Sequence, residues 1–399
     1  MERGDDESVL GEIRTHSPPL LVHHSIPLSS VLQQLHLDPP PPAEIPLASR
    51  LVAASDNWRR IEASSQTILL ITKGYRLPFR FSRPAPLHWQ PRRQPNKFKT
   101  ESWTPRHLQD DMERQVQEWI QLGAIEKTTS SKGFVHPLFG IPKKDSSEAR
   151  PILDTRKLNF NLVRRHFQMD SLKTARQLLS PGEWMCKMDL SKAYWHVHLH
   201  KDTPRFLQFW WKGTRFQWKV MPFGISDAPR QFTLLVRQVL KFLRQHGIKI
   251  VAYIDDLLIM GNSKKSCKET TQFVRTIFES LGFLIKDSKS ILEPTQELEF
   301  LGMTLNSKHF TISLHPKRRR ALRRDIIRTL RTSHLNGKVL ASILGKLNAL
   351  HWATTATRES LVHLRALINS FPKKNRFSSK VPRQLTPEAR QELHQQNGS

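Results

Sequence analysis

Apolar residues between positions 124 and 314 occur mostly in short runs that are separated by longer segments of helical periodicity. Short runs rich in β-branched and aromatic residues predict strands, whereas residues 105–123, 228–246 and 266–281 predict helices. Thr104 is the expected N-cap of the first helix, with Pro105 at its first position. Strands interleaved with helices predict a mixed α/β, or α+β, fold.

The two ends of the chain have different patterns. Residues 1–46 include eight prolines and predict a disordered or polyproline-like arm that does not join a packed core. Residues 47–101 predict an N-terminal extension, with a short helix, a strand or extended segment up to about residue 81, and a proline-rich linker. The periodicity of residues 316–368 is helical throughout and predicts three helices, and residues 371–399 predict a basic tail or linker.

The composition adds a strong positive charge. The chain has 63 Lys and Arg residues against 35 Asp and Glu, a net charge of +28. The net charge of residues 1–46 is −5, so the net charge of the rest of the chain is +33. Such an excess indicates a polyanionic partner, while a hydrophobic content of 38% argues against a wholly disordered basic protein.

The sequence also restricts the compartment. Two cysteines in 399 residues indicate a reduced, intracellular protein rather than a disulfide framework. No apolar stretch approaches the length of a membrane span, and the N-terminus lacks the pattern of a signal peptide. We therefore expect no membrane partner, and a location in the cytoplasm or the nucleus. The basic residues 317–320 would suit either a nuclear address or a nucleic-acid-binding helix surface.

Three acids are the strongest candidates for chemistry. Asp255 and Asp256 interrupt the apolar run at residues 249–260 and predict the tip of a β-hairpin. Asp189 follows the apolar run at residues 184–188, so it too is expected at an exposed strand end. Carboxylates with no His or Cys beside them suit hard cations and indicate a site for Mg²⁺ or Mn²⁺. The simpler interpretation is that all three are turn or capping residues.

Histidines alternate at positions 196, 198 and 200 in a segment that predicts a strand. This spacing could place three imidazoles on one face as a zinc site. No fourth ligand is near in sequence, so a polar strand face beside bound nucleic acid is the simpler interpretation.

Six motifs, in order over residues 102–370, resemble those of reverse transcriptases. Residues 253–256 (YIDD) resemble the YxDD box, and residues 188–197 (MDLSKAYWHV) resemble the first palm motif. The other four are residues 139–159 in the fingers, 221–232 before a helix, 282–290 with a mobile lysine and 300–305 as the primer grip. Three features resemble DIRS-type, tyrosine-recombinase retrotransposons more than retroviruses: residues 50–79, the PFGISDAPRQFT form of the motif that begins at residue 221, and the helical C-terminal region.

This resemblance implies a right-hand polymerase. Fingers and palm would occupy residues 102–314, the palm being an antiparallel sheet plus helices, and a helical thumb would occupy residues 315–370. The implied reaction is RNA- and DNA-templated transfer of deoxynucleoside triphosphates onto a primer 3′ hydroxyl with two metal ions. The alternatives are a non-catalytic nucleic-acid-binding derivative and an inactive, truncated element copy. A ribonuclease H domain is not recognisable after the polymerase motifs, so we expect separate ribonuclease H and recombinase proteins as partners.

The resemblance also assigns roles to individual residues. The catalytic and metal-binding set is Asp189, Asp255 and Asp256, with Lys289, or its neighbour Lys286, protonating the leaving pyrophosphate. The residues that bind the nucleotide would be Lys143, Arg150, Tyr194, Phe223 and Gly224, with Tyr194 as a gate against a 2′ hydroxyl. The residues that bind nucleic acid would be Arg156, Asn159, Leu301, Gly302, Lys317, Arg318, Arg319, Arg323 and Arg324.

Overall fold

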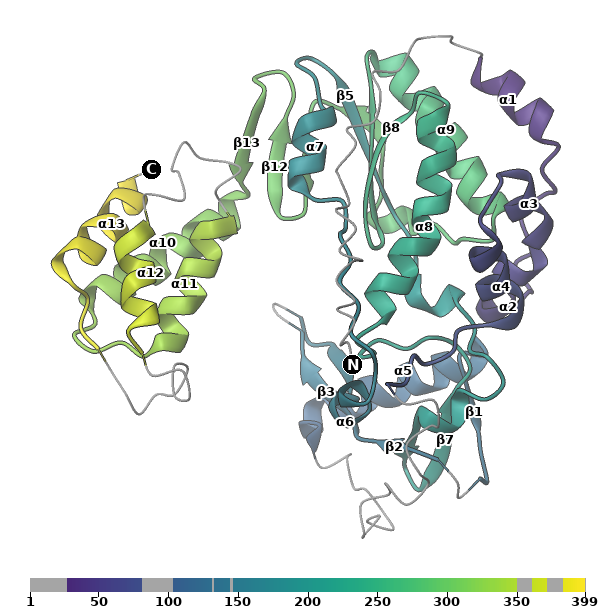
Figure 1. Cartoon of the computed structure of the whole chain (residues 1–399), viewed down its shortest axis with the longest axis horizontal. Helices are drawn as coiled ribbons and strands as arrows, with labels where there is room; N and C mark the ends of the chain where they lie inside the picture. The colour runs from purple at the N-terminus through teal and green to yellow at the C-terminus, as the bar shows by residue number, and fades with distance from the viewer. Residues whose placement is uncertain are drawn as a thin grey trace, which may run out of the picture.

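The computed structural model describes residues 27–80, 103–130, 133–143, 146–349, 361–371 and 383–398 (Figure 1). Sheets and helices form one large body, and the helices after residue 315 form a separate group at one end of the long axis. The prediction of a mixed α/β, or α+β, fold is confirmed. The predicted proline-rich linker and the first 26 residues of the predicted arm lie outside the described residues.

A central antiparallel sheet has the strand order β10-β5-β9-β8. Its strands are β5 (Trp184–Asp189), β8 (Lys249–Tyr253), β9 (Asp256–Gly261) and β10 (Ile291–Thr295), and the helices beside it are α7 (Leu172–Leu178), α8 (Ala228–Gln245) and α9 (Lys264–Ser280). The helices predicted at residues 228–246 and 266–281 are thus confirmed. Figure 1 shows α8 and α9 alongside the sheet.

Alternation of side chains along the strands gives this sheet two buried faces. Cys186, Ile250 and Ile259 belong to the core that includes α8 and α9. Met185 and Leu258, one position away on the same strands, pack instead with α7 and with the next sheet. Burial on both faces explains why these strands read as nearly continuous apolar runs in the sequence.

Two smaller sheets lie outside the central sheet, and the second of them contains much of the motif predicted for the fingers at residues 139–159. The first has the order β1-β7-β6-β2 and the second is the hairpin β3-β4. Their strands are β1 (Ile125–Lys127), β2 (Val135–His136), β3 (Leu138–Pro142), β4 (Ala149–Leu153), β6 (Gln208–Trp211) and β7 (Thr214–Trp218). The remaining helical segments between residues 103 and 206 are η3 (Arg106–Leu108), α5 (Gln109–Gln121), α6 (Arg156–Phe160), η4 (Ala193–His196) and η5 (Pro204–Phe206).

The helix predicted over residues 105–123 is shorter than expected and starts differently. Thr104 is not its N-cap, because the Thr104 hydroxyl oxygen accepts a 2.9 Å hydrogen bond from the Gly140 amide of β3. A 3₁₀ turn, η3, fills the first positions, and α5 begins at residue 109. Thr104 thus ties this segment to the β3-β4 hairpin instead of capping a helix.

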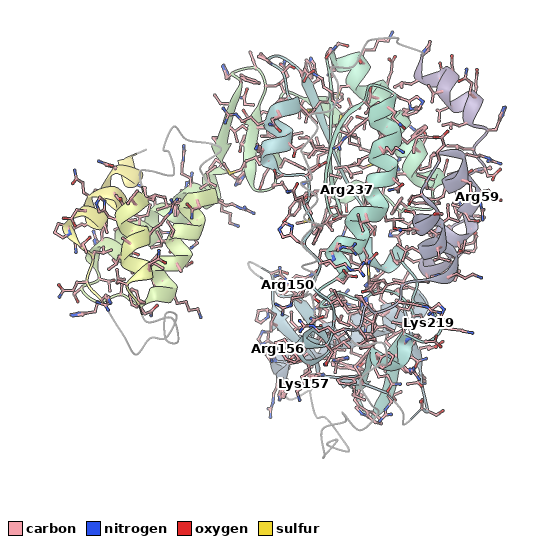
Figure 2. The ribbon with its side chains drawn as sticks, viewed as in Figure 1. Arg59, Arg150, Arg156, Lys157, Lys219 and Arg237 are labelled. Atoms are coloured by element: carbon pink, nitrogen blue, oxygen red, sulfur yellow. The ribbon has the colours of Figure 1, made fainter. Side chains whose placement is uncertain are left out.

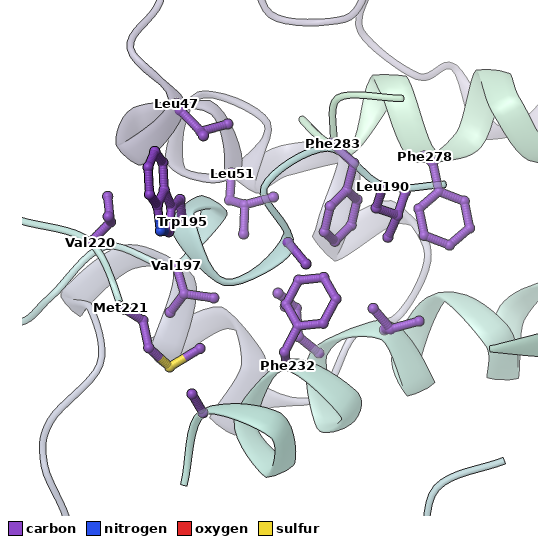
Figure 3. Packing of buried hydrophobic residues seen from close by; sticks show 14 of the residues in the cluster. Leu47, Leu51, Leu190, Trp195, Val197, Val220, Met221, Phe232, Phe278 and Phe283 are labelled. Carbon is purple, nitrogen blue, oxygen red and sulfur yellow. The ribbon is translucent and has the colours of Figure 1, made fainter. Parts of the chain in front are cut away.

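The N-terminal region contains two errors of sequence-based prediction. Residues 27–46 join the core, since Val31 of α1 (Leu28–Leu35) is buried and Arg50 donates hydrogen bonds to the carbonyls of Pro41 and Pro42. The strand or extended segment expected up to about residue 81 is helical as far as Lys73, in the last of the helices α2 (Leu47–Ala53), α3 (Ser55–Arg60) and α4 (Ser65–Lys73). It is extended only after Lys73, where Tyr75 and Phe79 form isolated bridges to Leu199 and Leu162. Figure 3 shows Leu47 and Leu51 of α2 packed beside Trp195 and Val197.

A third sheet connects the body to the helical group. It comprises β11 (Glu297–Phe300), β12 (Met303–Asn306) and β13 (Thr311–Leu314), and it leads into α10 (Pro316–Arg331), α11 (Gly337–Ala349), α12 (Val362–Asn369) and α13 (Pro387–Gly398). The prediction of a basic tail or linker after residue 371 is wrong for α13. Its Ala389 and Leu393 are buried in the same cluster as Leu340 and Leu364. No helix in the described ranges is long and apolar enough to cross a membrane.

Candidate active site

Three acidic residues lie at the same end of the central sheet, where β5 ends and β8 turns into β9. Asp189 ends β5 and pairs in register with Asp256, the first residue of β9. Ile254 and Asp255 form the turn between β8 and β9, and Ile254 takes the positive φ of 57° that this two-residue turn requires. The Leu190 amide donates a 2.9 Å hydrogen bond to the Asp255 carbonyl, which holds the turn against the end of β5. The hairpin tip predicted from the sequence is present.

Two of these acids are in surroundings that disfavour their charged forms. Burial raises the pKa of Asp189, which is only 7% exposed, and the nearby Lys289 ammonium partly opposes that rise. Burial also raises the pKa of Asp255, and the neighbouring carboxylate of Asp189 adds to the effect. A divalent cation between two such groups would relieve both penalties, so this donor set fits Mg²⁺ or Mn²⁺.

Asp256 differs from the other two acids because it already has a cationic partner. The Lys187 Nζ lies 2.9 Å from Asp256 Oδ1, and both side chains are partly buried. Among the described residues no three His, Cys, Asp or Glu side chains form a ready-made cluster for a metal ion. Of the three acids, Asp256 is therefore the one held in an ion pair within the described residues. Sequence reasoning missed Lys187, although its position two residues before Asp189 on a strand places both on one face.

Tyr194 lies beside the hairpin turn in η4. Its ring meets the Phe232 ring edge to face, with centroids 5.8 Å apart. Burial and the adjacent Asp255 carboxylate raise the pKa of the Tyr194 hydroxyl to about 12. Tyr194 is therefore a neutral, well-packed aromatic next to the acids.

The segment that carries the predicted mobile lysine is fastened to β5. The Lys286 amide donates to the Asp189 carbonyl at 2.8 Å, and the Asp189 amide donates to Ser290 Oγ at 3.0 Å. Lys286 and Lys289, the last residue of η6 (Asp287–Lys289), are both exposed. The charge of Lys289 acts on both Asp189 and Asp255, which makes it the better placed of the two lysines.

Phe223 and Gly224 form the loop that joins the fingers region to α8. The Phe223 ring packs against Trp119 and Trp218, with centroids 6.1 and 5.8 Å away. Gly224 has a φ of +97°, and a Cβ there would lie 2.8 Å from the Leu153 carbonyl oxygen, so no larger residue fits without rearrangement.

Asn159 fastens this loop rather than pointing to open surface. Its amide nitrogen donates to the Gly224 carbonyl at 2.8 Å, and its Oδ1 accepts from the Ser226 amide at 2.9 Å. The Asn159 side chain is predicted from the sequence to contact nucleic acid. In the structure it instead holds the loop at Gly224 in position.

The predicted triphosphate-binding cations lie on the β3-β4 hairpin. Lys143 Nζ is paired with Glu148 Oε2 at 2.5 Å, whereas Arg150, opposite Ile141 in the register, is exposed. Arg156 makes a two-pronged ion pair with Asp154, with contacts of 2.9 and 2.6 Å. Figure 2 shows Arg150, Arg156 and Lys157 along one side of this region.

The predicted primer grip is the turn between β11 and β12. Leu301 and Gly302 both have positive φ values, 50° and 79°. The Arg318 guanidinium of α10 occupies the space where a Cβ of Gly302 would be. Of the three acids only Asp256 shares an open hollow of about 430 Å³ with this turn, and the walls of the hollow are Lys187, Tyr253, Asp256, Glu299, Leu301, Gly302 and Arg318.

Helix α10 presents a cationic surface next to this hollow. Leu322, Ile326 and Thr329 face the helical group, and the predicted nucleic-acid-binding residues Lys317, Arg318, Arg319, Arg323 and Arg324 are exposed. Several of these cations lie in the first turns, where the helix dipole is positive, so the charge is unfavourable for the helix itself and suits an anionic ligand.

The three histidines do not share a strand face. His196 ends the 3₁₀ segment η4 and is buried, and its Nε2 accepts a 3.0 Å hydrogen bond from the Leu284 amide. His200 instead contacts Arg76, with 2.7 Å between the Arg76 Nη2 and the His200 Nε2. The polar strand face beside nucleic acid, predicted from the alternating spacing, is therefore wrong.

Comparisons with solved structures define the fold. The foamy viral protease-reverse transcriptase in complex with dsDNA matches 95% of this chain and 72% of its own length, with a TM-score of 0.61 and 20% identity. The same enzyme in complex with an RNA/DNA hybrid matches 96% of this chain with a TM-score of 0.56 and 19% identity. The chain thus has the right-hand polymerase fold.

Sequence comparisons define the domain. Residues 141–305 match the family model described as reverse transcriptase (RNA-dependent DNA polymerase). The putative enzymatic polyprotein of Cassava vein mosaic virus is 24% identical over 267 residues, which is 65% of this chain and 38% of the polyprotein. The Gag-Pol polyprotein of Walleye dermal sarcoma virus is 29% identical over 171 residues, 42% of this chain and 10% of the polyprotein. The chain therefore contains a reverse transcriptase domain and spans less than half the length of these relatives.

Proposed function

We propose that this chain is an RNA-directed DNA polymerase that extends a primer 3′ hydroxyl on an RNA or DNA template. The pair of carboxylates, Asp189 and Asp255, carries the proposal. A strand end and a hairpin turn bring them together, and burial raises both pKa values. The polymerases of similar fold are described in complex with dsDNA and with an RNA/DNA hybrid, which supports the same class of ligand here.

The proposed metal ligands are Asp189 and Asp255, together with phosphate oxygens of the incoming deoxynucleoside triphosphate. Bound Mg²⁺ or Mn²⁺ would supply charge stabilisation for the in-line displacement. Asp256 would support this site through its ion pair with Lys187. Tyr194, neutral and packed on Phe232, would exclude a ribose 2′ hydroxyl by its bulk.

The nucleotide would reach the acids from the β3-β4 hairpin. Arg150 is exposed there and would bind the triphosphate with its planar guanidinium. Lys143 would break its ion pair with Glu148 and bind phosphate instead. Phe223 and Gly224 would form the floor under the nucleotide. Lys289 would donate a proton to the departing pyrophosphate.

The primer–template duplex would lie along the hollow and α10. Leu301 and Gly302 would approach the primer end with their backbone, and the cations of α10 would contact phosphates without reading sequence. On its sequence motifs we also place the chain with DIRS-type retrotransposons. In that setting a ribonuclease H and a recombinase would act as partner proteins.

Extension of a labelled DNA primer on an RNA template tests the proposal. The purified chain with Mg²⁺ and deoxynucleoside triphosphates should give stepwise products that a chelator abolishes. A folded chain that shifts the primer–template in a gel but extends no primer would favour the two alternatives, a nucleic-acid-binding derivative or an inactive copy.

A further inference from the structure

An exposed aromatic ring and a cation lie together at the end of α6. Phe160 is 66% exposed, more than any other large hydrophobic side chain in the described residues. The Arg80 guanidinium carbon lies 5.7 Å from the centroid of its ring. A cation on one side of the ring and solvent on the rest leave an aromatic surface for a ligand.

Backbone contacts hold Arg80 in this place. The Arg80 amide donates to the Asn161 carbonyl and its Nε donates to the Leu162 carbonyl, both at 3.0 Å. The Val163 amide donates in turn to the Pro78 carbonyl at 2.7 Å. The N-terminal extension, which lies outside the matched family model, thus supplies half of the ring–cation pair.

The chain on either side of Phe160 is positively charged. Residues 155–169 include four Lys and Arg residues and no Asp or Glu. All four, Arg156, Lys157, Arg164 and Arg165, are exposed, and within the described residues Arg156 is the one of them paired with an acid, Asp154. An open aromatic ring flanked by cations is the combination with which proteins bind single-stranded nucleic acid, through base stacking and phosphate contacts.

The pair is also close in the chain to the proposed active site. Asn159, the residue before Phe160, is bonded to the Gly224 carbonyl and the Ser226 amide, so α6 is fixed to the loop proposed as the nucleotide floor. A base that stacks on Phe160 would therefore belong to a nucleotide next to the one paired in the proposed active site.

We propose that Phe160 and Arg80 form a stacking platform for an unpaired base of the single-stranded template, with Arg164 and Arg165 binding its phosphates. This proposal rests on the proposed polymerase function. Stacking requires only the aromatic face of the base, so the platform would accept any template sequence.

Binding measurements without metal or nucleotide test the platform. Fluorescence anisotropy gives the Kd of two primer–templates that share one duplex, one blunt and one with a single-stranded RNA 5′ overhang. The wild-type chain should prefer the overhang. Phe160→Ala should weaken binding of the overhang substrate about tenfold and leave the blunt duplex unchanged, because one base–aromatic stack is lost.

Three further variants sharpen the result. Phe160→Trp should keep the preference, and Arg80→Gln should reduce it. Leu69→Ala, which removes a 59% exposed side chain on α4, should change neither Kd. Undiminished overhang preference in Phe160→Ala, or an equal loss on both substrates, would overturn the platform. If the chain prefers the overhang but extends no primer, the polymerase function would be rejected and the platform would still be supported.

Discussion

Three neighbouring acids at the edge of the central sheet have different environments. Burial raises the pKa values of Asp189 and Asp255, whereas Asp256 forms an ion pair with Lys187 at 2.9 Å. A cation that enters this edge therefore gains most from the first two carboxylates. The pair Asp256–Lys187 would act as a support that orients the turn.

Asp256→Asn should therefore retain more activity than Asp255→Asn. Loss of a supporting group typically reduces activity 10–100-fold, whereas loss of a direct ligand should reduce it about a thousandfold or more. Single-nucleotide incorporation rates measure both. The incorporation rate of Lys187→Met should be close to that of Asp256→Asn. The rate of the double variant should be no lower than that of the slower single variant. Equal losses for Asp255→Asn and Asp256→Asn would contradict this division.

His196 should make stability depend on pH. Burial lowers its pKa to about 4, and the Leu284 amide donates to its Nε2. An unfolded histidine titrates near pH 6.5, so between pH 6.5 and 4 the unfolded chain binds more protons than the folded one. The free energy of unfolding should therefore fall on acidification, by about 2 kcal/mol between pH 7 and pH 5 from this residue.

Urea titrations across that pH range check the prediction. His196→Gln keeps a polar side chain without the titration, so its stability should change less with pH than that of the wild type, although it starts lower at pH 7. Identical pH slopes for the two proteins would assign the acid sensitivity to other groups, such as the buried His136.

At the scale of single elements, α10 is the principal proposed contact with the duplex. It carries eight Lys and Arg residues against Asp325, and its apolar residues face the helical group. Each phosphate contact releases counterions, so log Kd should depend steeply on log salt.

Arg323→Gln should weaken primer–template binding and reduce the salt slope by about 1, the value for one lost phosphate contact. Anisotropy titrations over a range of salt concentrations give the slope. Lys268→Gln on α9, which removes another exposed positive charge, one that is paired with Glu293, should leave the slope unchanged. The same slope for wild type and Arg323→Gln would remove this residue from the duplex contact.

The elements differ in how well the sequence predicts them. The hairpin at Asp255 could be predicted because two apolar runs flank two polar residues. The helix α4 could not be found from apolar content, since its β-branched residues favour strands, yet its N-cap was visible: Ser64 Oγ accepts from the Thr67 amide. Leu385, just before α13, and Ala389 and Leu393 within it have a spacing of four that indicates a buried stripe, and the polar residues between them obscured it.

The sequence predicts the three acids of the proposed active site but not the residues that hold them and the neighbouring loop in place. A single sequence marks Asp189 and Asp255 through the ends of apolar runs. The partners of Lys187 and Asn159 depend on strand register and on a loop from another motif, which only the folded chain brings together. Long-range hydrogen bonds of this kind leave no periodic signal in the sequence.

On the scale of the whole molecule, the helical group has a hydrophobic core of its own. Leu340, Leu364 and Leu393 belong to one cluster, while the apolar residues of the central sheet and of α8 and α9 belong to others. The helical group and the rest of the chain should therefore unfold as separate cooperative units.

Leu340→Ala should destabilise the helical group by about 2–5 kcal/mol, because it removes a fully buried side chain. Hydrogen exchange followed by mass spectrometry should show faster exchange in α10–α13 and unchanged protection in β5, β8 and β9. Leu257→Ala in β9 should give the reverse pattern. Faster exchange throughout the chain in both variants would show one cooperative unit instead of two.

The rate of single-nucleotide incorporation on an RNA template tests the central claim most directly. With Mg²⁺, the wild type and Asp202→Asn, an exposed acid outside the site, should incorporate the correct deoxynucleotide at similar rates. Asp189→Asn and Asp255→Asn should lose about a thousandfold or more in rate while binding the primer–template as the wild type does. Incorporation by either variant at the wild-type rate would contradict the assignment of these carboxylates as the catalytic metal ligands.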